Sequence, residues 1–296
     1  MIRRIVVSFV VLTTVVVAAL GGLTAAWLAG IRVPIASGTT YMEIQKLAAA
    51  DAAGAPTNMF FIALVGSDFR PGVGGARGDA LHLVGVNPTT HIATMLNVPR
   101  DTCWQGGKIN RAHAQGGPRG MANALGDLTG VPVSYVVSVD FAGFQGLVDG
   151  MGGVQINVPF PMDDENSGAV FAPGDQRLNG GQALSFSRDR HDFPTSDIQR
   201  SGNQGLLILS ALGQLQREAR SAVGEFKAAA LIGRHAQLDG MGLGDVYRLG
   251  RVAQQLNPAA ARSVTIPVGG GSCLPLVGDA RGLFADFADD ATLQAH

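Results

Sequence analysis

Short apolar runs alternate with longer segments of helical periodicity along most of this chain. Runs of this length, bounded by glycine, proline or asparagine, are typical of buried strands, and the segments between them are long enough for helices. The alternation predicts an α/β domain with layered α-β-α architecture around a central sheet. The expected strands are 58–65, 80–86, 92–98, 135–139 and 154–158, with weaker candidates at 183–187 and 264–267. The expected helices are 118–128, 141–151, 197–219, 226–235 and 243–256.

The connection between the second and third expected strands is short. It contains Asn87, Pro88, Thr89 and Thr90, residues that favour a tight turn. A tight turn joins antiparallel neighbours, whereas the helical connections elsewhere favour parallel ones. The central sheet is therefore expected to be mixed.

The N-terminus carries an uncharged apolar run over residues 5–30, preceded by Arg3 and Arg4. About 26 residues at a rise of ~1.5 Å exceed the roughly 30 Å of hydrocarbon in a bilayer. Basic residues ahead of the run predict a cytoplasmic N-terminus. We expect a single-pass signal anchor in the cell membrane, with the remaining chain extracytoplasmic. The alternative is a cleaved signal peptide, whose apolar core is usually only about 7–15 residues long.

This pattern predicts three parts. Residues 1–30 form a cytoplasmic tip and the transmembrane anchor, and residues 31–56 form a membrane-proximal segment in which 42–53 are expected to be helical. Residues 57–296 form the extracytoplasmic domain. The formal net charge is -1, so there is no basic excess to bind a nucleic acid.

Two cysteines, Cys103 and Cys273, fall in the part expected outside the membrane, where disulfides persist. An even pair in that compartment indicates one bridge. The alternative is two buried free thiols, because unpaired cysteine is often buried as a small apolar residue.

Arginine and aspartate gather in a few short segments, although only 15% of the chain is charged. The first segment holds Asp68, Arg77 and Asp79, and the second holds Arg188, Arg190, Asp197 and Arg200. Guanidinium groups match phosphate oxygens, and carboxylates hold Mg²⁺ that bridges the remaining oxygens. The combination suits a metal-bound pyrophosphate.

The positions of these residues relative to the expected strands support one site. Asp68 follows a buried strand, where α/β folds place ligands, and Asp79 precedes the next strand. Arg188 and Arg190 are expected to end the weak strand 183–187, where alternate positions point the same way. Arg100 beside Asp101 ends another strand, although a surface ion pair would explain those two alone.

The sequence shows no nucleophilic triad and no histidine pair with metal-ligand spacing. His82, within an expected strand, is interpreted as structural, and His191 as a solvated loop residue. The apolar positions of the helices at 118–128, 141–151 and 197–215 fit either ordinary core packing or the lining of an apolar channel.

Several motifs, in order and spacing, resemble the LytR–CpsA–Psr family over about residues 57–218. The motifs are Gly66-Ser67-Asp68 with Arg77-x-Asp79, Val98-Pro99-Arg100-Asp101-Thr102, Lys108-Ile109-Asn110, Val139-Asp140-Phe141 with Leu147-Val148-Asp149 and Gly152-Gly153-Val154, Leu178-Asn179-Gly180-x-Gln182-Ala183-Leu184, Arg188-x-Arg190-His191, and Asp197-x-x-Arg200. Gly78 departs from the serine usual in the family.

The resemblance implies a phosphotransferase that moves a glycopolymer from a polyprenyl-pyrophosphate carrier onto peptidoglycan. By matching positions, Asp68 and Asp79 would hold Mg²⁺ (or Mn²⁺), and Arg100 would act with Asp79 at the reacting phosphorus. The pyrophosphate would be bound by Arg77, Arg188, Arg190, Arg200, Gln204 and Lys108.

Two other functions stay open. A polyprenyl-pyrophosphate pyrophosphatase would use the same residues with water as the acceptor, and a non-catalytic lipid-binding or regulatory wall protein would bind without turnover. We expect a monomer.

Overall fold

A computed structural model describes residues 42–47, 59–68, 78–190, 196–218, 236–241 and 243–294. The expected anchor at 1–30, the helix expected at 226–235, Arg77 and His191 lie outside these residues. Within the described ranges, no helix combines the length and the apolar character needed to cross a bilayer.

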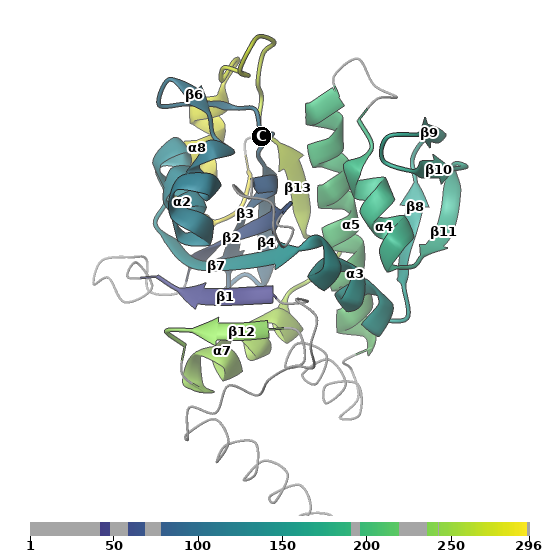
Figure 1. The fold of residues 1–296 in the computed structure, drawn as a ribbon. Helices are drawn as coiled ribbons and strands as arrows, with labels where there is room; N and C mark the ends of the chain where they lie inside the picture. The colour runs from purple at the N-terminus through teal and green to yellow at the C-terminus, as the bar shows by residue number, and fades with distance from the viewer. Residues whose placement is uncertain are drawn as a thin grey trace, which may run out of the picture. The chain divides into compact units, whose positions relative to one another are not determined.

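The core of the fold is a seven-stranded sheet with the order β12-β1-β7-β2-β3-β4-β13 (Figure 1). Its strands are β1 (Met42–Lys46), β2 (Phe60–Ser67), β3 (Gly78–Asn87), β4 (Ile92–Asn97), β7 (Val133–Asp140), β12 (Ala236–Asp239) and β13 (Arg262–Thr265). β2, β3 and β4 pair antiparallel, as does β1 with β7, whereas β2 with β7, β1 with β12 and β4 with β13 pair parallel. The sheet is mixed, as the sequence predicted.

Helices cover both faces of this sheet, which confirms the layered α/β class. On one face, α2 (Arg111–Thr129) and α8 (Ala280–Asp290) pack on alternate strand residues such as Leu81 and Leu83 of β3. On the other face, α5 (Ser196–Glu218) packs on β3, β4 and β13. The same alternation that buries Leu81 and Leu83 under α2 and α8 turns His82 toward the α5 side.

A second, smaller apolar cluster packs against α5 on the side of that helix that faces away from the sheet. It joins α3 (Phe141–Gly150) and α4 (Gly180–Arg188) to two small antiparallel pairs. The pairs are β8 (Val154–Val158) with β11 (Gly174–Leu178) and β9 (Met162–Asp164) with β10 (Ala169–Phe171). The strand predicted at 154–158 is therefore correct, but it lies outside the central sheet.

Two predicted elements are wrong. The helix expected over 42–53 begins as β1, because Met42–Lys46 pairs with β7 and completes the sheet on that side. The strand expected at 183–187 is helix α4. Asn179 caps that helix with a reciprocal hydrogen bond to Gln182, and this local signal outweighs the short apolar run.

The C-terminal region supplies both edges of the central sheet. β12 extends it beyond β1, and β13 extends it beyond β4. α7 (Leu243–Gln255) connects these two edges along the chain. Residues 236–294 are thus part of the same sheet domain, a role that the sequence left unassigned.

A disulfide joins Cys103 to Cys273, with the Cα atoms 5.1 Å apart. Cys103 lies in β5 (Cys103–Trp104), which pairs with β6 (Gly107–Lys108). Backbone hydrogen bonds flank the bridge, from Cys103 to Leu274 at 2.9 Å and from Leu274 to Asp101 at 2.8 Å. Of the two alternatives open for the cysteines, the structure has the bridge, which holds residues 273–274 against the loop that follows Arg100.

Candidate active site

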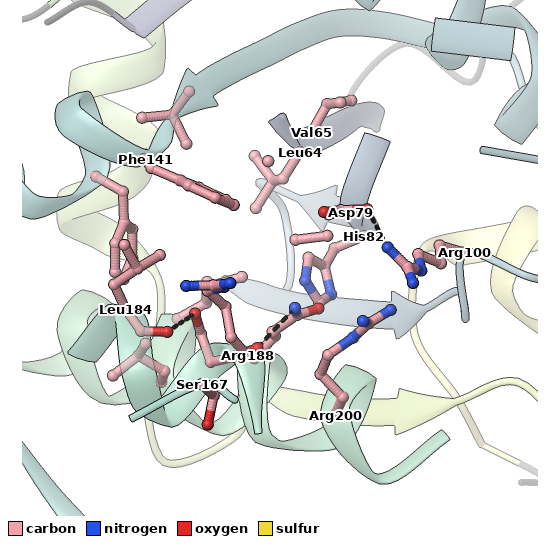
Figure 2. A pocket seen from close by; sticks show the side chains of 18 of the residues that line it. Leu64, Val65, Asp79, His82, Arg100, Phe141, Ser167, Leu184, Arg188 and Arg200 are labelled. Carbon is pink, nitrogen blue, oxygen red and sulfur yellow. Dashed lines mark hydrogen bonds and ion pairs between the residues drawn. The ribbon is translucent and has the colours of Figure 1, made fainter. Parts of the chain in front are cut away.

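A cavity of about 480 Å³ lies between the sheet and helices α3, α4 and α5. Figure 2 shows Asp79, Arg100 and Arg200 together on one side of it and the apolar Phe141 and Leu184 on the other. Further apolar side chains line it from the sheet, from α3 and from α5, namely Leu64, Val137, Val139, Phe144, Leu207 and Ile208. The cavity therefore joins a charged region to an apolar one.

The position of Asp79 depends on an irregularity in the sheet. Gly66 pairs with Ala80 but Ser67 pairs with Gly78, so Asp79 is an extra residue in β3. Strict alternation would place Asp79 on the face of Leu81, inside the apolar core. The bulge turns its side chain to the cavity instead, where it lines the wall.

Asp79 and Arg100 form an ion pair across the charged region. Nη1 of Arg100 donates to Oδ1 of Asp79 at 2.5 Å, and Nε of Arg100 lies 3.8 Å from both Asp101 and Asp197. Burial disfavours the charged guanidinium, but Asp79 and then Asp197 and Asp101 outweigh it, so the pKa of Arg100 lies above its ordinary value. Arg100 is a permanent cation at the cavity.

The first turn of α5 supplies a second pair. Arg200 donates from Nη2 to Oδ1 of Asp197, three residues earlier on the helix. Arg200 is only 6% exposed, and this burial lowers its pKa despite Asp197; Arg100 and Arg190 lower it further. Cations crowded in a buried place are stabilised by an anion between them.

Arg188 and Arg190 reach the cavity from the end of α4. Arg188 is the last residue of the helix and lies with its guanidinium carbon 5.3 Å from the centre of the Phe141 ring. Arg190 follows the buried Asp189. Both line the cavity as expected, but the reason given by the sequence is wrong, because a helix end and not a strand end carries them.

Three buried nitrogen atoms of cavity-lining residues make no hydrogen bond to any described residue. They are Nε of Arg100, Nε of Arg200 and Nε2 of His82. Buried polar atoms are nearly always paired in native structures, and an unpaired one costs about 1–3 kcal/mol. The two Nε–H groups are donors, so they suit a ligand rich in acceptor oxygens, such as a phosphate.

His82 is one residue of this site that sequence reasoning missed; Asp164, Asn166 and Ser167 also line the cavity and were not predicted. His82 was interpreted as structural, yet it lines the cavity and is 1% exposed. Burial lowers its pKa to about 4, against a hydrogen bond to Asn97 that raises it, so the ring is neutral at physiological pH. The signal was present in the alternation of β3, because Ala80 and His82 share the face of that strand that meets the cavity.

Of the remaining predicted residues, one lines the cavity and two do not. Gln204 lines the cavity and donates from Nε2 to the carbonyl of Ser187 at 3.0 Å. Lys108 is not among the lining residues; its Nζ lies 2.6 Å from Oδ2 of Asp101. Asp68 directly follows β2 and is not a lining residue either.

The two expected metal ligands lie near the same end of the neighbouring strands β2 and β3. Ser67 pairs with Gly78, so Asp68 and Asp79 each follow a residue of the same pair. Within the described part of the chain, no group of three or more acidic, histidine or cysteine side chains is placed to hold a metal alone. The donor set therefore fits a Mg²⁺ held by one or two carboxylates together with phosphate oxygens and water.

Comparison with known proteins identifies relatives of this fold and sequence. Residues 35–274 match the LytR_cpsA_psr family. The polyisoprenyl-teichoic acid–peptidoglycan teichoic acid transferase TagU of Bacillus licheniformis is 34% identical over 155 residues, 50% of this chain and 50% of that protein. TagV of Bacillus subtilis, with the same activity in its name, is 29% identical over 159 residues, 49% of this chain and 41% of that protein. The chain spans about half the length of such curated relatives, or less.

Solved structures share the fold. The LytR-Csp2A-Psr enzyme from Actinomyces oris superposes with a TM-score of 0.66 at 25% identity, over 80% of this chain and 92% of that one. A structure of TagT bound to LI-WTA superposes with a TM-score of 0.63 at 21% identity, over 83% of this chain and 96% of that one. At this identity the likeness supports the fold alone.

Proposed function

Because the chain belongs to the LytR_cpsA_psr family, we propose that it is a transferase that moves a glycopolymer from a polyprenyl-pyrophosphate carrier onto peptidoglycan. The observation that carries this proposal is the composition of the cavity. Four arginines and Asp79 lie at a cavity that is also lined by many apolar side chains, with Asp140, Asp164 and a few uncharged polar residues among them. A prenyl pyrophosphate has the same division, with an anionic head joined to an apolar chain.

The reaction follows from the linkage. A hydroxyl of the wall polymer attacks the phosphorus that carries the glycan, and a new P–O bond forms to that hydroxyl oxygen. The bond from this phosphorus to the bridging oxygen breaks, and the bridging oxygen leaves with the prenyl monophosphate. The hydroxyl proton is released to a base or to water. Most of the rate enhancement in such transfers comes from positioning and charge stabilisation.

The residues divide by their placement. Arg188, Arg190 and Arg200, together with Gln204, would bind the pyrophosphate from the helix side. Arg77, which lies outside the described residues, would add a further guanidinium. Arg100 would stabilise charge at the reacting phosphorus, because it is a fixed cation beside Asp79. Lys108, which is paired with Asp101 outside the cavity lining, would act at most at its edge.

Asp68 and Asp79 would hold Mg²⁺ against the pyrophosphate. When bound, the ion neutralises phosphate charge and lowers the repulsion that an incoming oxygen meets. Asp79 would contribute a carboxylate oxygen to the ion, and its ion-pair partner Arg100 would act on the phosphate.

We also place the domain outside the cell membrane, anchored by residues 1–30 in a single pass, and regard the protein as a monomer. Protease added to intact protoplasts should digest the domain. Full protection of the domain would contradict this topology.

A reconstituted transfer assay tests the function. The full chain in detergent is supplied with a prenyl-pyrophosphate-linked glycan, Mg²⁺ and peptidoglycan, and the products are resolved by mass spectrometry. We expect glycan on peptidoglycan and free prenyl monophosphate, both lost when EDTA is added. Free glycan phosphate of equal yield with or without peptidoglycan would instead identify a pyrophosphatase, and bound but unaltered lipid would identify a binding protein.

A further inference from the structure

His82 is a buried polar residue at the cavity to which neither the fold nor the proposed roles assign a function. Its Nδ1 lies 2.8 Å from Oδ1 of Asn97, and its Nε2 makes no hydrogen bond to any residue in the described ranges. Figure 2 shows the ring on the same wall as Asp79, with Arg200 and Arg188 nearby in the view. An unpaired ring nitrogen at this place requires a partner.

The ring is held by a chain of contacts that crosses the sheet. His82 pairs in register with Asn97, and Asn97 pairs with Thr265 on the next strand. Nδ2 of Asn97 lies 2.8 Å from Oγ of Ser263 and 3.4 Å from Oγ1 of Thr265. The orientation of the imidazole is therefore fixed by two neighbouring strands.

Helix α5 packs directly against Asn97 and Ser263. A Cβ atom added at Gly205 would lie 2.4 Å from Oγ of Ser263 and 2.7 Å from both amide atoms of Asn97. Only glycine lets the helix approach the sheet so closely at this point. The close contact confines Asn97, and through it His82.

Either neutral tautomer of His82 fits these positions. Hydroxyl groups donate as readily as they accept, so Ser263 and Thr265 can bond either end of the Asn97 amide. When Oδ1 of Asn97 faces the ring, Nδ1 carries the proton; when Nδ2 faces the ring, Nδ1 accepts and Nε2 carries the proton. The pair can thus present Nε2 as a neutral donor without taking up a proton.

The chemistry of the ligand favours one of these two tautomers of His82. A pyrophosphate esterified at both ends offers only acceptor oxygens, so a lone pair on Nε2 would repel it and an N–H would bind it. Adding a proton to the ring instead would place another cation among Arg100, Arg188 and Arg200. Asp79 is the acidic side chain on the same strand, and it is engaged by Arg100.

We propose that His82 is a further binding residue for the head group, donating a hydrogen bond from a neutral Nε2–H to a phosphate oxygen next to the prenyl chain. This inference rests on the proposed function. The ring shares its register position with Leu64 of β2, which lines the apolar walls, and lies three residues from Asp79 on β3. It stands at the border between the charged and apolar regions, where a neutral donor is less costly to bury than a cation.

Calorimetric titration of the full chain in detergent tests the proposal. The probe is farnesyl-pyrophosphoryl-N-acetylglucosamine with Mg²⁺, because neither of its phosphates titrates near neutral pH. His82→Gln keeps a neutral N–H donor, whereas His82→Leu keeps apolar volume and loses the donor. We expect H82Q to bind within about threefold of the unaltered protein, and H82L to bind on the order of tenfold more weakly. The exposed His91 provides the control, since His91→Gln should leave the affinity unchanged.

A second measurement reads the tautomer in the unaltered chain itself and uses a variant only to assign the signal. With ¹⁵N-labelled histidine, NMR reports which ring nitrogen carries the proton, and the His82 signal is assigned as the one missing in H82Q. In the complex we expect the proton on Nε2 and none on Nδ1.

The outcomes separate the two proposals. Binding by H82L as tight as by the unaltered chain, equal losses in H82Q and H82L, or an unprotonated Nε2 in the complex would each overturn the role of His82 while leaving the head-group site intact. Failure of the unaltered chain to bind the probe would overturn the proposed function itself.

Discussion

Arg100 and Asp79 form an ion pair with each other and also line the ligand cavity. Substituting either residue therefore removes both a contact to its partner and a contact to the ligand or metal. Without Asp79, Arg100 loses its hydrogen-bonded partner and the expected metal loses a ligand. Without Arg100, the site loses a fixed positive charge, but Arg188, Arg190 and Arg200 remain at the cavity. The two variants should therefore differ in binding and agree in catalysis.

Asp79→Ala and Arg100→Ala should each abolish glycopolymer transfer, with losses of at least about 10²–10³-fold for the arginine, because one preorganised donor contributes that much. Arg100→Ala should still retain prenyl lipid. The transfer assay and mass spectrometry of bound lipid check the two statements. Arg119→Ala is the matched control, since Arg119 is a largely exposed arginine on α2 that is not among the cavity-lining residues. Near-normal transfer by either site variant would contradict the assignment.

His82 also makes stability depend on pH. Its pKa is lowered to about 4 in the folded chain, against about 6.5 when unfolded, because the buried ring resists a charge. Between these values the unfolded chain binds more protons, so the free energy of unfolding should fall as pH is lowered from 6.5 to 4. The loss attributable to this residue is up to about 3 kcal/mol.

Denaturant unfolding at several pH values measures this effect. H82Q should lack that part of the acid destabilisation, and His91→Gln should keep it. Identical pH dependence in H82Q and the unaltered chain would show that the ring is not buried in its neutral form.

At the scale of the element, α5 determines the site because it carries Arg200 and Gln204 and approaches the sheet at Gly205. Gly205→Ala should destabilise the fold by about 1–3 kcal/mol, because the new methyl group overlaps Asn97 and Ser263. It should also weaken binding of the prenyl-pyrophosphate probe, since His82 is displaced with Asn97.

Gly202→Ala is the control on the same helix. The nearest atom to its added Cβ is Oγ1 of Thr265 at 3.6 Å, an ordinary contact. Alanine in a helix interior should be neutral or stabilising by up to about 1 kcal/mol. Equal stability of the two variants in denaturant unfolding would refute the close packing at Gly205.

Most of these elements could be predicted from the sequence, and the exceptions have physical reasons. The apolar runs of β2, β3, β4 and β7 and the turn after Val86 were sufficient to predict a mixed sheet. The run 183–187 was ambiguous, because a short apolar segment fits a strand or one face of a helix, and the cap at Asn179 decides. The bulge at Asp79 leaves no mark that a single sequence could reveal.

The site residues likewise divide into those that the sequence predicted and those that it missed. The clustering of arginine and aspartate predicted one site with Asp79, Arg188, Arg190 and Arg200, and the family resemblance added Arg100; all five line the cavity. His82 was missed because a lone polar residue in a strand is usually structural, and its unpaired Nε2 becomes visible only when Asn97 and α5 are placed around it. The role of Arg77 in binding the pyrophosphate and the membrane anchor at residues 1–30 stay predictions.

At the scale of the whole molecule, the Cys103–Cys273 bridge closes a loop with a sequence separation of 170. Replacing both cysteines by serine should lower the free energy of unfolding by roughly 2–5 kcal/mol, since the unfolded chain gains freedom. The loop that carries Arg100 and Asp101 should also loosen, because Leu274 bonds to Asp101.

Calorimetry or denaturant unfolding gives the stability, and a thiol assay on unfolded, unreduced protein gives the state of the cysteines. We expect no reactive thiol. Two reactive thiols per chain would contradict the bridge.

The central claim is that one cavity holds the pyrophosphate at its arginines and the prenyl chain at its apolar walls. A crystal structure of the chain with farnesyl-pyrophosphoryl-N-acetylglucosamine and Mg²⁺ tests it most directly. We expect phosphate oxygens within hydrogen-bonding distance of Arg188, Arg190 and Arg200, with the prenyl chain against Leu64, Phe141 and Leu207. A pyrophosphate bound away from these arginines, or a prenyl chain lying outside the cavity, would contradict it.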